Sequence, residues 1–82
     1  MHSETLPTSK QLLASWARIW QQKLNGKPDD IKQAIGNHVK LFPKGNHSEV
    51  EARTKRTIAA HSGDPKTIRA LLNRAQANLR NL

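Results

Sequence analysis

The C-terminal segment 64–82 constrains the fold of this chain more than any other part of its sequence. Asp64 can accept hydrogen bonds from the free backbone N–H groups of a first helical turn, and Pro65 suits the first helical position because it has no N–H and its φ is already helical. Apolar residues then recur at steps of three and four, which places them on one face of an α-helix of about five turns. They are Ile68, Leu71, Leu72, Ala75, Leu79 and Leu82. The segment therefore predicts one long amphipathic helix that can close a hydrophobic core.

Three earlier segments also begin with residues that favour helix starts. Thr8 or Ser9 can cap the first, and Pro28 suits the first position of the second. Ser48, followed three residues later by Glu51, has the capping-box spacing for the third. Together with the C-terminal segment, they predict helices at about residues 9–24, 28–41, 49–61 and 65–82.

The connections between these segments are short and contain residues that stop helices. Asn25-Gly26 can take the left-handed conformation just past a helix end, and Pro43 disfavours helical conformation at the residue before it. No stretch shows the alternation of β-branched residues that indicates a strand. The sequence therefore predicts an all-α fold, a small four-helix single domain over residues 8–82 with short loops, preceded by a flexible N-terminal tail at 1–7.

Several residues on the apolar faces allow more than one interpretation. Trp16 and Trp20, one helical turn apart, could be stacking platforms for bases or for a partner, but their position in the middle of the apolar face favours core anchors. Gly36, inside the second predicted helix, destabilises it by about 1 kcal/mol relative to alanine and indicates a close helix–helix contact or a kink. We expect His38 to be a half-buried, hydrogen-bonded imidazole rather than a metal ligand.

The residues that catalysis requires do not form a recognisable set. Cysteine is absent, and no two of the four histidines are four residues apart. Most of the carboxylates fall at predicted helix starts, where they act as caps or complement the helix dipole. These are Asp29, Asp30, Glu49, Glu51 and Asp64. We therefore expect no enzymatic activity, no catalytic residues, no metal and no cofactor.

Net charge is the strongest indication of a partner. The chain carries 14 Lys and Arg against 6 Asp and Glu, a net charge of +8 with a pI of about 10.7. Residues 42–82 hold eight of these cations against three acids, and five of the six arginines. Such a surface favours a polyanionic or acidic partner, and guanidinium groups are good planar donors to phosphates and guanine edges.

We therefore expect a small basic helical module that binds nucleic acid, DNA in preference to RNA, in a regulatory or accessory role. The contacts would come from an Arg/Lys surface on the C-terminal half. The candidate residues are Arg53, Lys55, Arg56, Lys66, Arg69, Asn73, Arg74, Gln76 and Arg80.

The last two predicted helices, joined by a turn at Gly63, have the outline of a helix-turn-helix. The alternative is an ordinary helical hairpin with a basic outer surface, because Asp64 would face phosphates and the final helix is long for a recognition helix.

A different class of function is also open. The chain could be a protein-interaction adaptor or inhibitor that docks on an acidic protein or self-associates as a homodimer, since the apolar face of the third predicted helix is thin. We see no signal-peptide pattern, and no apolar run approaches the roughly 20 residues that span a bilayer. We expect a cytoplasmic protein without a membrane partner.

Overall fold

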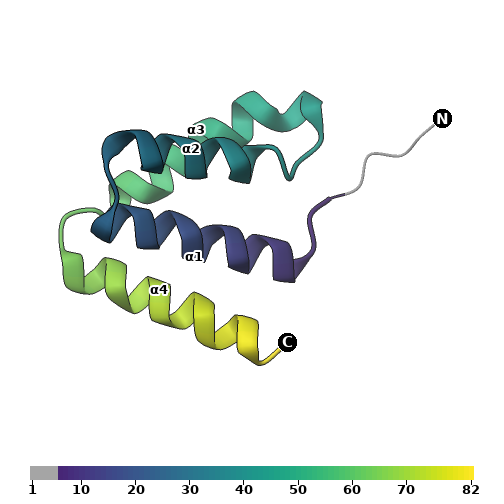
Figure 1. The fold of residues 1–82 in the computed structure, drawn as a ribbon. Coiled ribbons are helices and arrows are strands. Elements are labelled where there is room, and N and C mark those ends of the chain that lie inside the picture. The colour runs from purple at the N-terminus through teal and green to yellow at the C-terminus, as the bar shows by residue number, and fades with distance from the viewer. Residues whose placement is uncertain (1–5) are drawn as a thin grey trace.

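The computed structural model describes residues 6–82 and consists of four α-helices and one short 3₁₀ helix (Figure 1). The elements are α1 (Ser9–Asn25), α2 (Pro28–Val39), η1 (Lys44–Asn46), α3 (His47–Ala60) and α4 (Pro65–Arg80). Residues 6–82 contain no strand, so the predicted small all-α four-helix fold is confirmed. Residues 1–5 of the predicted tail lie outside the described residues. Within 6–82, every helix is too short or too polar to cross a membrane.

Two of the predicted helix starts are confirmed in atomic detail. The Thr8 hydroxyl accepts a hydrogen bond from the Gln11 N–H at 3.1 Å, and the Gln11 side chain accepts one from the Thr8 N–H at 2.8 Å. This reciprocal pair is a capping box that satisfies two backbone donors at the start of α1. At the start of α4, the Asp64 carboxylate accepts from the Lys66 N–H at 3.0 Å.

The predicted start of the third helix is wrong. Ser48 is not its N-cap, because α3 begins at His47 and Asn46 occupies the cap position without a side-chain hydrogen bond. The reason is η1, which leads straight into α3 and supplies backbone carbonyls as hydrogen-bond acceptors. The Asn46 N–H, for example, donates to the Pro43 carbonyl at 2.9 Å. The stop at Gly26 is correct, but the backbone there is extended, with φ of −90° rather than left-handed.

α1 is the central helix of the domain. α4 packs along one side of it and α2 along another, while α3 packs against α2 (Figure 1). The buried core takes side chains from all four helices. Its members are Ile19, Trp20, Ala34, Ile58 and Ile68. Ile19 is fully buried and Trp20 is 4% exposed, so α1 supplies the centre of the core.

The third and fourth helices do not form the packed pair that the sequence suggested. No Cα atom of α3 lies within 8 Å of a Cα atom of α4. Both expectations, a helix-turn-helix and an ordinary helical hairpin of these two helices, are therefore wrong. The short connection redirects the chain, and α4 packs on α1 because the broad apolar face of α1 offers more surface than the thin face of α3.

Candidate nucleic-acid interface

A row of polar side chains runs the length of α4 beside its buried stripe. Its members follow one another at steps of three and four residues, so they share one face of the helix. We call this set the α4 polar row, consisting of Lys66, Arg69, Asn73, Gln76 and Arg80. All five side chains are exposed, whereas Ile68 and Ala75 on the neighbouring face are buried. The apolar stripe that fixes α4 on α1 therefore also fixes the direction of the row.

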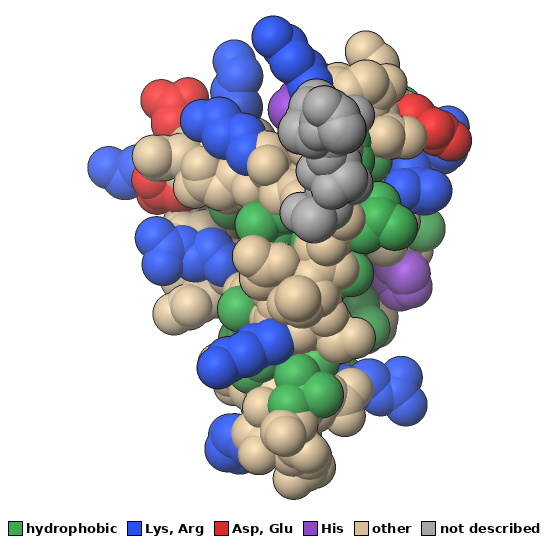
Figure 2. All heavy atoms as spheres, turned by 90° about the vertical axis from the view of Figure 1, so that its right-hand side faces the viewer, with side chains coloured by type: hydrophobic (Ala, Val, Ile, Leu, Met, Phe, Trp, Pro, Cys, Tyr) green, Lys and Arg blue, Asp and Glu red, His purple; other side chains and the backbone are tan. Residues whose placement is uncertain are grey.

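The cations of the α4 polar row have no carboxylate partner among residues 6–82. The ion pair found in this part of the chain joins Lys55 and Glu51, one turn apart on α3, at 3.0 Å. On the end of the molecule that Figure 2 shows, acidic side chains lie only on the upper half, while the blue side chains of Lys and Arg also lie on the lower half, where α4 is. The charge of the row is therefore available to a ligand.

One acid lies close to the row along the chain. Asp64 precedes Lys66 by two residues, but its carboxylate is occupied as the cap of α4. It hydrogen-bonds a backbone N–H there and complements the positive end of the helix dipole. This leaves the rest of the row, from Arg69 to Arg80, without an acidic residue on the same helix.

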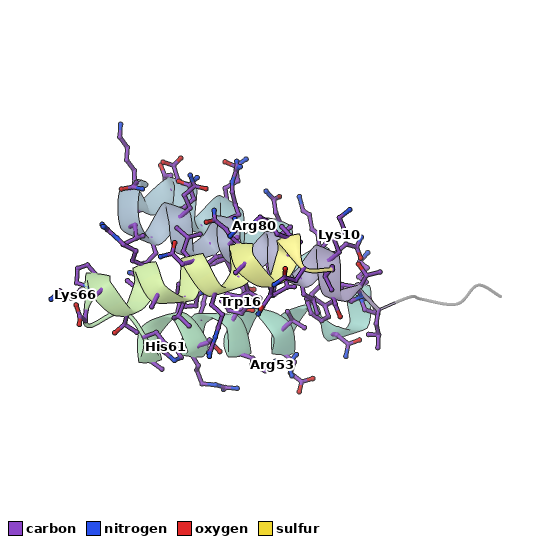
Figure 3. The ribbon with its side chains drawn as sticks, turned by 90° about the horizontal axis from the view of Figure 1, so that it is seen from below. Lys10, Trp16, Arg53, His61, Lys66 and Arg80 are labelled. Atoms are coloured by element: carbon purple, nitrogen blue, oxygen red, sulfur yellow. The ribbon has the colours of Figure 1, made fainter. Side chains whose placement is uncertain are left out.

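The remaining predicted contact residues are exposed but point elsewhere. Arg53 projects on the side of the molecule opposite to Arg80 (Figure 3). Lys55 is paired with Glu51. Arg56 is the next residue of α3 and lies about 100° further around that helix. Arg74 is on α4, but its helical position places it on the other flank from the row. The nine predicted residues thus divide into one continuous row and four separate cations.

Lys10 lies near the end of the α4 polar row, although it was not among the residues predicted from the sequence. The start of α1 and the end of α4 lie at the same end of the molecule, and Lys10 and Arg80 lie on the same side of it (Figures 1 and 3). The periodicity of each helix gave no sign of this, since it does not state which helices are neighbours. The candidate interface therefore comprises the α4 polar row and Lys10.

The two tryptophans lie mainly in the core, and one of them reaches the surface. Trp16 and Trp20 stack with ring centroids 5.3 Å apart, and Trp20 is buried while Trp16 is only partly buried. Trp16 lines a pocket of about 390 Å³ between α1 and α3, and Arg53 lines the same pocket. The interpretation as core anchors is thus confirmed for Trp20 and holds in part for Trp16.

His38 is more deeply buried than the sequence suggested. Its ring is 2% exposed, lies edge-on to Trp16 with centroids 4.9 Å apart, and places Nδ1 2.6 Å from the Ser15 hydroxyl. A neutral ring with its proton on Nε2 accepts a hydrogen bond from that hydroxyl. Burial, and then the charge of Arg53, lower the pKa of His38 below its ordinary value of 6.5.

Acid is therefore expected to destabilise the fold through His38. The unfolded chain takes up a proton near pH 6.5 and the folded chain resists it, so the free energy of unfolding is highest above that pH and falls as the pH drops below it. The substitution His38→Gln removes the titrating group and should flatten this dependence. Urea unfolding at a series of pH values measures the effect, and identical profiles for the two proteins would contradict it.

Among residues 6–82, no group of three or more His, Asp or Glu side chains is placed to hold a metal ion. Comparison with known proteins adds no assignment, because no protein-family model, no curated protein and no solved structure matches this chain.

Proposed function

We propose that this protein binds nucleic acid, double-stranded DNA in preference to RNA, through the α4 polar row and Lys10. The observation that carries the proposal is a straight, exposed row of three cations and two amides without a carboxylate partner among the described residues. A surface of this composition meets the requirements of phosphate binding, which is electrostatic and uses Lys and Arg together with amide side chains.

The length of the row suits a nucleic-acid backbone. From Lys66 to Arg80 the helix rises about 21 Å, at 1.5 Å per residue. This distance matches about six base pairs along duplex DNA, at 3.4 Å each. Three cations and Lys10 can therefore meet several phosphates in succession, while Asn73 and Gln76 between them are side chains that can hydrogen-bond base edges. The major groove of B-DNA admits a helix, whereas that of A-form RNA is too narrow, and this favours DNA.

The salt dependence of binding tests this proposal directly. With Lys10, Lys66, Arg69 and Arg80 each neutralising one phosphate, the logarithm of the binding constant should fall with that of the salt concentration with a slope of about −3.6. The measurement is fluorescence polarisation of a labelled DNA duplex, with an RNA duplex of the same sequence expected to bind more weakly. A slope near zero, or no binding tighter than about 100 μM at low salt, would overturn the proposal.

A further inference from the structure

A second surface, on the side of the domain formed by α2 and α3, is apolar at its floor and basic at its rim. It is a groove of about 580 Å³. Its apolar lining comes from one face of α2 and consists of Pro28, Ile31, Ile35 and Val39. Its other lining residues are Lys32, Gly36, Lys40, His47, Glu51 and Lys55. The groove is separate from the α4 polar row, none of whose members lines it.

Gly36 is one of the residues that line the groove. One of the two explanations that its sequence position suggested is wrong: a Cβ atom added there would meet no atom within 4 Å, so no close helix–helix contact requires glycine. Its φ is not positive either. Glycine nevertheless destabilises a helix interior by about 1 kcal/mol relative to alanine. What the missing side chain does provide is open space in the groove, because Gly36 is one of its lining residues and has no atom near the position of a Cβ.

The charges of the rim indicate what the groove can bind. Three lysines and one acid line it, and that acid, Glu51, is already paired with Lys55 at 3.0 Å. Lys32 and Lys40 therefore remain as exposed positive charges on the α2 side. A second copy of this chain, itself at +8, would bring like charge to this rim, whereas an acidic partner would be attracted.

We propose that the groove between α2 and α3 binds an amphipathic helix of a partner protein whose apolar residues are flanked by Asp or Glu. The apolar lining of α2 repeats at Ile31, Ile35 and Val39, one residue per turn. From Pro28 to Val39 the lining extends for about 16.5 Å along the helix, which is enough for about three turns of a docked helix. An apolar helix face in a hydrophobic groove is a recurring mode of recognition, with anchors at i, i+4 and i+7.

Selection from a displayed library of helical peptides on the immobilised full chain tests the proposal. We expect enriched peptides to carry apolar residues at i, i+4 and i+7 with flanking acids. The best of them, synthesised with a fluorophore, should lose at least tenfold in affinity for the variant Gly36→Leu, which fills the groove, and for the double variant Lys32→Glu with Lys40→Glu. The matched control is Gly63→Leu, since Gly63 lies outside the groove and an added Cβ also meets no atom within 4 Å there.

Several outcomes would overturn the proposal. One is a selection without enrichment, and another is enriched peptides that lack acids or bind Gly36→Leu as tightly as the wild-type protein. A wild-type dimer in sedimentation analysis that Gly36→Leu converts to a monomer would assign the groove to a second copy instead. Unfolding of the variant does not explain a loss of affinity, because leucine favours a helix more than glycine does. The midpoint temperature of thermal unfolding of Gly36→Leu should therefore not be lower than that of the wild-type protein. The same variant should keep its affinity for DNA, so the two proposals can fail independently.

Discussion

Replacing Trp20 by alanine is expected to remove a large share of the protein's free energy of unfolding. The side chain is 4% exposed and belongs to the core cluster to which all four helices contribute. Truncation of a buried tryptophan destabilises by about 3–5 kcal/mol, because apolar contacts are lost and a cavity remains. A chain of this length has a total free energy of unfolding of only about 4–12 kcal/mol. Circular dichroism during urea and thermal unfolding measures the loss.

Trp16 provides the matched control for this substitution. It is the same residue type, one turn away, and stacks on Trp20 with ring centroids 5.3 Å apart, but it is only partly buried. Trp16→Ala should therefore destabilise clearly less than Trp20→Ala. Leu82→Ala, at a side chain that is 68% exposed, should change stability very little. An equal loss for both tryptophan variants would contradict the central place of Trp20 in the core.

Charge reversal of two arginines in the α4 polar row is expected to reduce the affinity for duplex DNA about 100-fold. The double variant Arg69→Glu with Arg80→Glu removes two charge-assisted hydrogen bonds at about 1.5 kcal/mol each, and 1.4 kcal/mol corresponds to a factor of ten. The salt dependence should also become less steep by about 1.8. Both side chains are exposed, so the fold should remain intact. Fluorescence polarisation across a salt series measures both quantities.

A second double variant separates the position of the charges from their number. Arg56→Glu with Arg74→Glu changes the net charge equally, at two exposed arginines outside the row. We expect this variant to lose less than about tenfold in affinity, since neither arginine belongs to the row and exposed charges that do not contact a phosphate are partly screened at physiological salt. If both double variants weakened binding equally, the binding would follow the overall charge of the protein, and the α4 polar row would have no special part in it.

Local chemistry made the helices of this protein predictable. Caps such as Thr8 and Asp64 act through hydrogen bonds to residues two or three positions away, so their effect can be judged from the sequence. The predicted start of α3 at Ser48 was wrong because η1 leads directly into the helix, so no side-chain cap is present there. That the five residues of the α4 polar row share one face follows from helical periodicity alone.

The arrangement of the helices in space could not be predicted in the same way. A short connection suggested that α3 and α4 are neighbours, yet the strength of an apolar contact depends on the area that two faces bury together. α3 offers Val50, Thr54 and Ile58 as its buried residues, and α4 found a larger surface on α1. The packing of α4 on α1 also decides which cations lie on one surface. It explains why Lys10 was not predicted as a contact residue, while Arg53 was grouped with residues of α4 that lie on the opposite side of the molecule.

The packing of the first helix against the last has a consequence for how the chain acquires its structure during synthesis. Of the four helices, α1 leaves the ribosome first, and α4, which covers one of its sides, leaves it last. Until then, part of the apolar surface around Ile19 and Trp20 stays open to water or to chaperones. A chain cut short before residue 65 would keep that surface exposed and would be an aggregation-prone product rather than a shortened domain.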